Sequence, residues 1–553
     1  MALSQARNEA PVDAAESWFR SRSNAAAVFV LFLGFLARLW AASGTFLNPD
    51  EALHFRLANQ PSLYLAYKAS LTASHPPLLT LLLYYWRAFG TSELWLRLLL
   101  VLASVVFCWV FYKWLSNAAG SLAGFIGLLF VALLPPIVLL SVDIRQYPLL
   151  LAFLAAALYL LDESFAKQSI ARMAGFTLCL YLAMLSHYSA FLFAAALGIY
   201  AVLRIFRERP PARLALVWAI GQLGTLVLAI FLYKTHISKL GVGESRTALQ
   251  GWMSEFFLRH SYFDPAHDNP LLFLIGHSFG VFQYFFGQLA VGDLAGILFI
   301  VGALLLLGKG FAYNQTSSRR LGIFLLLPFV VACGASLAHV YPYGGTRHIA
   351  FLMIPGVAGV GIAVDQLMDQ RWFRAVGFAG LILALCIAFG KQRQPYMRRS
   401  DQSRTRMNEA SDFLRERARS PEVVFTDYES DLMLGHYLCR QKPIAFQSST
   451  PDFEVFSCDG VRIVSAGYKA ATLFDGNHFF NSWDRLLETY QLKPGTIVWI
   501  FQAGWDVNLS EDLQRQYAEF RNLRIESFGN NIKIFKLTVG QPMPAVNSKS
   551  AAP

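Results

Sequence analysis

Long apolar stretches recur through roughly the first 390 residues of the chain and then stop. Each is about 14 to 22 residues long, and a straight helix needs about 20 residues to cross the hydrocarbon core of a bilayer. The chain is therefore predicted to be a polytopic α-helical membrane protein. The predicted spans are residues 24–43, 93–114, 121–140, 148–161, 170–187, 189–206, 214–233, 290–308, 321–339, 349–367 and 375–390.

One further apolar segment, residues 271–289, fits two positions. It can cross the membrane, or it can lie flat at the surface as an amphipathic helix. We favour the flat position, because it keeps the basic stretches 204–213, 309–320 and 371–374 on one face, which the positive-inside rule assigns to the cytoplasm. The basic residues of 391–399 argue the other way, so the span count stays open by one or two helices.

From about residue 400 the pattern changes to short β-rich runs separated by helical stretches, which is typical of a small α/β domain. This domain, predicted at 400–540, follows an odd number of spans and is therefore expected outside the cytoplasm. Residues 1–23 are predicted to be a cytoplasmic tail and residues 541–553 a disordered one. Strands are predicted at 423–427, 443–446, 461–466, 496–501 and 532–537, and helices at 405–418, 481–490 and 510–520.

Composition supports a membrane protein and excludes several other classes. Hydrophobic residues make up 55% of the chain and charged residues only 15%, whereas a soluble domain carries about 25% charged residues. A disordered protein, a collagen-like fibre and an ordinary cytosolic enzyme are excluded. The net charge of +11 reflects loop orientation and contact with anionic lipid. No basic stretch is interleaved with stacking aromatics, so no nucleic-acid partner is predicted. We expect a multi-pass protein of the inner or plasma membrane.

The cysteines fit this plan. Four lie in apolar spans and are expected to be small core residues: Cys108, Cys179, Cys333 and Cys386. Cys439 and Cys458 are the only two in the predicted α/β domain, where an oxidising exterior would permit a disulfide, although sequence does not fix its geometry. No Cys/His spacing is typical of a structural zinc site.

Ionisable residues at membrane depth are costly, so their positions carry information. Here they gather at the ends of spans on the predicted exterior side. The first group, Asn48 to His54, follows the first span. It can be a helix start with Asp as N-cap and an acidic first turn, worth about 1 kcal/mol. Alternatively, Asp50 and Glu51 form a carboxylate pair at the membrane surface, and one of them acts as a base.

Three further groups lie near later spans. Pro76 and Pro77 fix an extended entry into a helix, so the preceding His75 is either incidental or a rigidly presented imidazole. Asp143 and Arg145 can pair in a turn, or supply a carboxylate and a cation to an external cavity. The last of the three, His187-Tyr188, is either an interface anchor or part of the same cavity.

The fifth group, residues 341–348, leads into the span at 349–367. Gly344 and Gly345 allow close approach of a ligand. Arg347 can grip a phosphate in bidentate fashion, or it can snorkel to lipid headgroups. Together the five groups place three acids, several histidines and two arginines on one external face. A transporter would more often bury polar residues near the midplane, and here the mid-span residues are apolar.

The order of these motifs resembles the GT-C membrane glycosyltransferases, above all the family 39-like protein mannosyltransferases and the lipid A aminoarabinose transferase. The matching motifs run over residues 30–360. The family usually has Arg-Tyr where this chain has Arg347-His348, so the role of His348 is open. The motifs are Arg38, Asp50-Glu51, His75-Pro76-Pro77-Leu78, Ser92-Glu93 with Arg97, Arg145-Gln146-Tyr147-Pro148, His187-Tyr188 and Arg347-His348 through Pro355.

The resemblance implies about 11–13 transmembrane helices in a domain over 24–395, with interfacial helices in the loop 44–92. It also implies inverting transfer of a hexosyl or pentosyl group from a polyprenyl-phosphate-linked donor to a protein, lipid or glycan acceptor on the extracytoplasmic face. Asp50 and Glu51 would be the catalytic carboxylates, with Asp50 as general base. Arg347 and Arg145 would bind the donor phosphate. Substrates would be oriented by His54, His75, Asp143, Tyr147, His187, Tyr188 and His348.

Several alternatives remain open at this point. A transporter or flippase of a lipid-linked substrate and a non-catalytic scaffold for envelope assembly are the competing functions. The α/β domain can cover the cavity, bind acceptor or serve only for packing. Relatives differ in their need for a divalent cation, and no ligand spacing here is strong enough to predict a metal site.

Overall fold

The structure is a computed structural model, and it divides into two compact units. The membrane unit comprises residues 1–42, 70–79 and 97–393, and the α/β unit comprises residues 43–69, 80–96 and 394–553. The residues it describes are 2–239, 258–309, 312–313, 316–368, 401–418, 421–439, 444, 448–450, 452–467, 471–505, 507–517 and 520–540.

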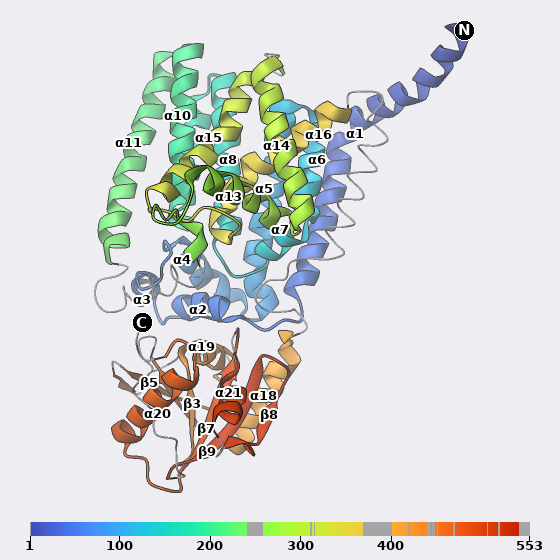
Figure 1. Cartoon of the computed structure of the whole chain (residues 1–553). Helices are drawn as coiled ribbons and strands as arrows, with labels where there is room; N and C mark the ends of the chain where they lie inside the picture. Colours follow the sequence, from blue (N-terminus) through green and yellow to red (C-terminus); the bar gives the residue numbers. More distant parts are fainter. Residues whose placement is uncertain are drawn as a thin grey trace. The chain divides into compact units, whose positions relative to one another are not determined.

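The membrane unit is a bundle of helices around one apolar core (Figure 1). Eight helices in the described ranges are long and apolar enough to cross a membrane. Each predicted span is helical, except 375–390, which lies outside the described residues, and two of the spans, 121–140 and 349–367, are divided between two elements. The helices are α1 (Ala2–Ala42), α5 (Glu93–Ala119, whose first turn belongs to the α/β unit), α6 (Ser121–Leu133), α7 (Pro135–Leu140), α8 (Tyr147–Ala166), α9 (Ile170–Ser186), α10 (Ala190–Glu208), α11 (Ala212–Thr235), α13 (Pro270–Phe286), α14 (Leu289–Lys309), α15 (Ser318–Leu337) and α16 (Met353–Met368).

Short elements connect these helices. The 3-10 turns η2 (Ile237–Lys239) and η4 (Arg259–Ser261) follow α11, and η5 (Arg347–Leu352) leads into α16. A two-residue hairpin of β1 (Ala312–Tyr313) and β2 (Thr316–Ser317) precedes α15.

The predicted span 121–140 is not one helix. Leu134 between α6 and α7 is extended, with φ −61° and ψ 125°. Pro135 and Pro136 explain the break, because neither has an N–H to donate to the preceding turn and the ring of a proline disfavours helical backbone in the residue before it. The apolar pattern predicted the length of this segment correctly, but the two prolines divide it.

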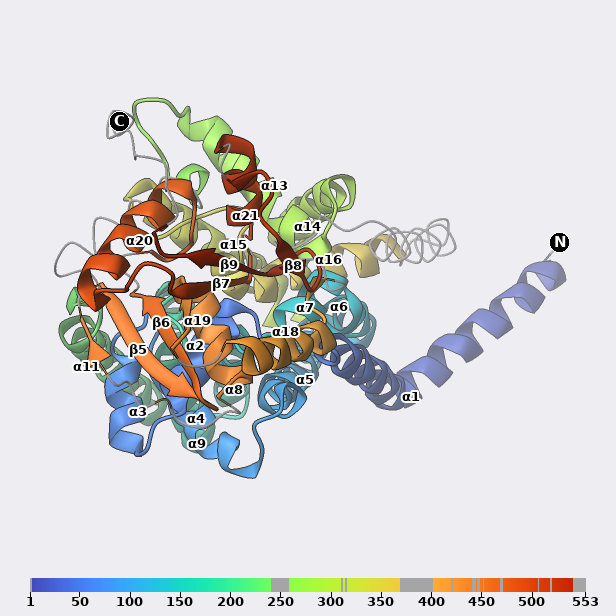
Figure 2. The same ribbon diagram turned by 90° about the horizontal axis from the view of Figure 1, so that it is seen from below.

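The ambiguous segment 271–289 forms α13. The side chain of Asn269 caps its start by accepting the N–H groups of Leu271 at 2.9 Å and Leu272 at 3.2 Å. In Figures 1 and 2, α13 lies across the direction of α14. This direction differs from that of α14, and the flat position of α13 at the membrane surface stays a prediction.

The α/β unit is built on a seven-stranded sheet with the order β4-β5-β6-β3-β7-β9-β8. The central strands β6, β3 and β7 are parallel, and the outer strands are antiparallel to their neighbours. β3 is buried along its whole length, which explains its continuous apolar run. The strands are β3 (Val423–Thr426), β4 (Ser448–Ser449), β5 (Phe453–Cys458), β6 (Val461–Ala466), β7 (Ile497–Ala503), β8 (Ile525–Ser527) and β9 (Ile532–Thr538).

Helices cover both faces of this sheet (Figure 2). α20 and α21 pack on one face, where Phe479, Trp483 and Leu513 join the core. α18 and α19 lie on the other. The loop 44–92 forms three short helices and a 3-10 turn, and most of their residues belong to the α/β unit. The helices are α2 (Pro49–Ala58), α3 (Leu63–Ser70), α4 (Leu78–Trp86), η1 (Arg87–Phe89), α18 (Arg404–Arg417), α19 (Tyr428–Tyr437), α20 (Gly476–Tyr490) and α21 (Leu509–Gln516).

Most predicted elements of the α/β domain are found close to their expected bounds. β5 is a strand that the sequence analysis missed, and it forms a hairpin with β6 through Asp459 and Gly460, both at positive φ. An Asp-Gly pair between two apolar runs is a strong hairpin signal. α19, β4 and β8 were also not predicted. The predicted strand 443–446 and the tail 541–553 lie outside the described residues, apart from residue 444.

Cys439 and Cys458 form a disulfide, with 4.9 Å between their Cα atoms. It joins the chain just after α19 to the end of β5. Cys108 and Cys333 are buried free thiols and Cys179 is half-buried, as expected for core positions in apolar helices, while Cys386 lies outside the described residues.

Candidate functional site

Three of the predicted site segments meet around His187 in the membrane unit. The side-chain amide of Gln146 contacts Nδ1 of His75 at 2.9 Å. The rings of His75 and His187 stack with 5.7 Å between centroids, and the ring of Tyr147 lies 5.2 Å from that of His187. We call these four residues the imidazole cluster. Loops before α4, before α8 and after α9 therefore converge.

Local sequence explains how these side chains are presented. α8 begins at Tyr147, and Pro148 occupies its first turn, where the missing N–H costs nothing. His187 ends α9 in an extended conformation, with φ −155° and ψ 142°, and so turns its ring away from the helix. Ser189 then leads directly into α10. The sites at which helices start and stop thus define the cluster.

Positive charge is concentrated around His187, which lies between α9 and α10. The pKa of His187 is lowered to about 3, mainly by burial and further by the nearby charges of His348, Arg145 and Arg347. The backbone N–H of Ser189 donates to Nδ1 at 3.1 Å, so the neutral ring carries its proton on Nε2. Arg145 and Arg347, the two arginines predicted to bind phosphate, both lie close enough to His187 to lower its pKa.

One hydroxyl oxygen and one amide oxygen in this cluster lack a hydrogen-bond partner among the described residues. Among the described residues, neither the buried Tyr147 hydroxyl nor Oε1 of Gln146 has a hydrogen-bond partner. Buried polar atoms normally have one. Arg145 is also buried, at 6% exposure, and Asp143 lies half-buried in the same loop. The cluster therefore offers polar groups and positive charge to a bound polar, anionic group.

The glycine-rich segment before Arg347 packs against α13. A Cβ on Gly344, which has φ +136°, would lie 2.6 Å from Nδ1 of His277, and one on Gly345 would lie 2.8 Å from the carbonyl of Gly280. These glycines therefore have a packing role against α13, and close approach of a ligand to them stays a prediction. The Tyr341 hydroxyl donates to the carbonyl of His348 at 3.0 Å and so fixes the start of η5.

Tyr188 contacts His236 and not the imidazole cluster around His187. Its hydroxyl is hydrogen-bonded to Nδ1 of His236 at the end of α11, and Nε2 of His236 donates to the carbonyl of Ala73 at 2.8 Å. Tyr188 therefore ties the loop after α9 to α11 and to the segment that leads into His75. The sequence analysis missed His236, because nothing in its local pattern distinguishes it.

Asp50 and Glu51 lie at the start of α2 in the α/β unit. Asn48 is the N-cap: its side chain accepts the N–H of Glu51 at 3.0 Å, and the Glu51 carboxylate accepts the N–H of Asn48 at 3.0 Å. This capping box gives buried Glu51 a structural role, and Asn48 rather than Asp50 caps the helix. Asp50, in the first turn, is half-exposed.

Contacts with α19 hold α2 in place. The Arg56 guanidinium donates to both carboxylate oxygens of Asp431, at 2.9 and 2.8 Å, and to its backbone carbonyl at 3.0 Å. The rings of Phe55 and His436 meet edge to face at 4.9 Å, and His54 is buried in the same unit. The C-terminal part of the chain therefore builds the support of the helix that carries Asp50.

The segment before α2 is anchored as well. The backbone N–H of Leu47 donates to the Tyr437 hydroxyl at 2.8 Å, and that hydroxyl donates to Glu93 at 3.0 Å. Thr45 also pairs with Ser403 in an isolated antiparallel bridge. The sequence analysis grouped residues 44–92 with the membrane domain, whereas most of this loop belongs to the α/β unit.

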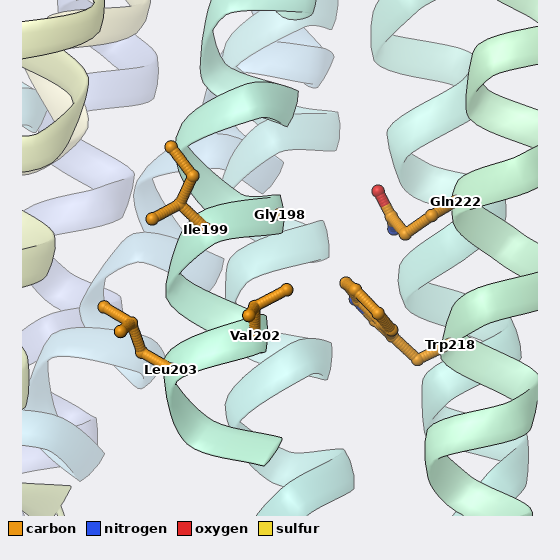
Figure 3. A pocket seen from close by; sticks show the side chains of 6 residues that line it. All are labelled: Gly198, Ile199, Val202, Leu203, Trp218 and Gln222. Carbon is orange, nitrogen blue, oxygen red and sulfur yellow. The ribbon is translucent and has the colours of Figure 1, made fainter. Parts of the chain in front are cut away.

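A groove opens between α10 and α11 (Figure 3). Gly198, Ile199, Val202 and Leu203 form one wall, and Trp218 and Gln222 form the other. It is almost entirely apolar apart from the Gln222 amide. α10 starts three residues after His187, so the groove lies along a helix that leaves the imidazole cluster.

The described residues contain no group of three or more His, Cys, Asp or Glu side chains placed to hold a metal ion.

No family model matches the sequence, and no curated protein matches it. Its structure is similar to that of ArnT from Cupriavidus metallidurans. The crystal structure of ArnT bound to undecaprenyl phosphate is 12% identical, with a TM-score of 0.53 over 92% of this chain and 97% of that chain. The apo structure is 12% identical, with a TM-score of 0.52 over 95% and 98%.

The chain has the ArnT fold. This confirms the resemblance to the GT-C proteins at the level of architecture: a polytopic helical domain with a small C-terminal sheet. An Archaeoglobus fulgidus oligosaccharyltransferase tethered to an acceptor peptide is a more distant likeness, with 11% identity and a TM-score of 0.47 over 88% of this chain and 70% of that chain.

Proposed function

We propose that this protein is an integral-membrane glycosyltransferase that moves a sugar from a polyprenyl-phosphate-linked donor to an acceptor on the extracytoplasmic face, with inversion. The observation that carries the proposal is the convergence of His75, Tyr147 and His187 in a chain with the ArnT fold. Buried Arg145 lies two residues before Tyr147, and both Arg145 and Arg347 are close enough to lower the pKa of His187. Two guanidinium groups in a desolvated setting attract an anion strongly. ArnT, whose fold this chain shares, was crystallised with undecaprenyl phosphate.

The proposed reaction is a single displacement. The oxygen of an acceptor hydroxyl, or the nitrogen of an acceptor amine, attacks the anomeric carbon. Its proton passes to the Asp50 carboxylate, which is the general base. The bond from that carbon to the phosphate oxygen breaks, and its electron pair leaves with the polyprenyl phosphate. Arg347 and Arg145 stabilise the charge that develops there. Attack from the face opposite the leaving group inverts the anomeric centre.

The remaining residues of the cluster orient the substrates in this proposal. His187 is neutral at pH 7 because its pKa is about 3, so its Nε2–H serves as a hydrogen-bond donor and not as an acid. His75, Tyr147 and His348 line the same region and present further polar groups to the sugar. Glu51 acts indirectly, by capping the helix on which Asp50 sits.

The donor's isoprenoid tail requires an apolar path in contact with lipid. We assign this role to the groove between α10 and α11 (Figure 3). α11 is the least buried of the candidate spans, because only 11% of its most apolar stretch is buried inside the protein. The groove therefore opens to the hydrocarbon region. α10 connects the groove to His187 at its N-terminal end.

The α/β unit is proposed to lie outside the cytoplasm. The disulfide between Cys439 and Cys458 is stable in an oxidising compartment and rare in the cytosol. Arg207 in the last turn of α10, Arg209 after it and Arg213 in the first turn of α11 form a basic junction at the end of these helices remote from His187, which fits a cytoplasmic position for that junction.

The test uses purified full-length protein in lipid nanodiscs and a panel of polyprenyl-phosphate sugars. Mass spectrometry of lipid-linked sugars that accumulate in a strain lacking the protein selects the panel. Asp50→Asn should abolish transfer while donor binding persists, and Arg347→Ala should mainly weaken donor binding. Arg172→Ala is the control, because Arg172 makes only a 3.8 Å contact with Glu163 at the opposite end of the bundle.

Near-wild-type transfer by Asp50→Asn would remove the base from the mechanism. If transfer by Arg347→Ala depends on donor concentration as it does in the wild-type protein, Arg347 does not bind the donor phosphate. Net movement of the donor lipid across liposomes without any sugar transfer would favour a flippase over the proposed enzyme.

A further inference from the structure

Arg38 is a buried cation inside an apolar span. It lies one turn before the end of α1 and is 1% exposed. A charge at membrane depth costs several kcal/mol unless it is well paired. The sequence analysis singled out Arg38 as part of a resemblance, and the proposed reaction gives it no task.

Every nitrogen of this guanidinium has a partner. Nη1 donates to the carbonyl of Ala132 at 2.6 Å, and Nη2 donates to that of Val131 at 2.9 Å. Nη1 also donates to the carbonyl of Gly34 at 3.0 Å, and Nε donates to the Ser104 hydroxyl at 2.8 Å. Arg38 thus joins α1 and α5 to the last turn of α6.

The identity of these two carbonyls is informative. In a continuous helix the carbonyl of residue i accepts the N–H of residue i+4. The partners of Val131 and Ala132 would therefore be residues 135 and 136, and both are proline, which has no N–H. Arg38 supplies the two donors that Pro135 and Pro136 lack.

A hydrogen-bonded path leads from Arg38 to the C-terminal end of α7, just before the loop that carries part of the imidazole cluster. The Ser104 hydroxyl donates to that of Ser141 at 2.9 Å, and Ser141 donates to the carbonyl of Ile137 at 2.5 Å. Ser141 caps the C-terminal end of α7. The loop that follows Ser141 carries Arg145 and Gln146.

We propose that Arg38 is a positioning residue: it stabilises the break between α6 and α7 and so sets the loop that presents Arg145 to the donor phosphate. Gly34 makes this possible, because a Cβ there would lie 2.9 Å from the Ala132 carbonyl oxygen and would push α1 away from α6. The inference rests on the proposed function only for its activity readout.

The test is a mutant cycle in the full-length protein. Arg38→Met removes the donors, and Pro135→Ala with Pro136→Ala gives the two carbonyls backbone N–H partners. Arg38→Met alone should lower the midpoint of thermal unfolding by about 5 °C or more. In the alanine background the same change should lower it by less than half as much.

Activity separates positioning from a purely structural role. Both the Arg38→Met and the alanine variants should show a rise of about tenfold in KM for the donor, because the loop with Arg145 shifts in each. The triple variant should therefore recover stability but not donor use. Arg38→Lys, which keeps the charge and part of the hydrogen bonding, should be intermediate in both measurements.

Two results would overturn the inference. The first is an equal loss of stability from Arg38→Met in both backgrounds, since the guanidinium would then not replace the proline N–H groups. The second is a wild-type KM for the donor in a folded Arg38→Met protein. If Arg38→Met fails to fold, Ser104→Ala breaks the path to Ser141 alone and must raise the donor KM.

Failure of the proposed function gives a different pattern. In that case the wild-type protein transfers no sugar from any donor, yet the stability cycle at Arg38 still shows the predicted dependence on Pro135 and Pro136. Binding of undecaprenyl phosphate then replaces KM as the readout of loop position.

Discussion

The ion pair between Arg56 and Asp431 allows a quantitative test of how the helix with Asp50 is supported. Asp431 is fully buried and the Arg56 side chain is 14% exposed. Asp431→Asn keeps the shape of the side chain but removes its charge and one of the two acceptor oxygens. Breaking a buried pair from one side costs about 3–5 kcal/mol, because the other charge is left without a partner.

This loss should appear locally at α2. A cost of 3–5 kcal/mol weakens the association of α2 with α19 by roughly 10² to 10⁴-fold. Hydrogen exchange followed by mass spectrometry should show faster exchange in peptides that cover Pro49–Ala58. Sugar transfer should fall as well, because Asp50 is no longer held in one orientation, whereas donor binding should persist.

Two controls make the result interpretable. Asp452→Asn breaks an ion pair with Arg485 in the same unit, but these side chains are 41% and 55% exposed, so less than about 1 kcal/mol should be lost. Arg56→Met combined with Asp431→Leu leaves no buried charge and should recover much of the protection. Unchanged exchange at α2 in Asp431→Asn would refute the assignment of this pair as its anchor.

Three further changes test other parts of the molecule. Burial raises the pKa of Asp427, the N-cap of α19, to about 6. The folded state therefore holds the carboxyl proton more tightly than the unfolded state does. The stability that this protonated carboxyl contributes is full below about pH 4 and is lost as the pH rises through 6. Asp427→Asn should flatten this part of the pH profile of thermal unfolding, and parallel profiles would contradict the reasoning. Cys458→Ala opens a disulfide that spans 19 positions and should lower the free energy of unfolding by roughly 3 kcal/mol, which denaturant titration measures; equal stability of the two proteins would argue against the constraint. Gly198→Trp should fill the groove beside Gln222 and raise the donor KM several-fold with little effect on kcat, and unchanged kinetics would place the isoprenoid tail elsewhere.

Hydropathy predicted the helices of the membrane unit well, because lipid-facing and core-facing positions of a span are both apolar. The break at Leu134 was also readable, since Pro135 and Pro136 cannot continue a helix. The capping box of α2 has the ordinary spacing, with Asn48 three residues before Glu51. The Asp-Gly turn before β6 was a further local signal that the sequence analysis did not use.

What sequence could not provide are the contacts between distant segments. The pair Arg56–Asp431 is separated by 375 positions, and no pattern within either segment indicates the other. The stacking of His75 on His187 likewise depends on how three loops pack. The role of the C-terminal domain stayed open for the same reason, because its support of α2 is visible only in three dimensions.

The discontinuity of the α/β unit has a consequence for biosynthesis. At about 5–20 residues per second, the 375 positions between Arg56 and Asp431 take roughly 20 to 75 s to translate. Throughout that time the helix with Asp50 has emerged from the ribosome without the surface that anchors it. A newly made chain should therefore gain activity only after its last segment has been made and has folded, and a stop codon before α19 should leave an inserted but inactive protein.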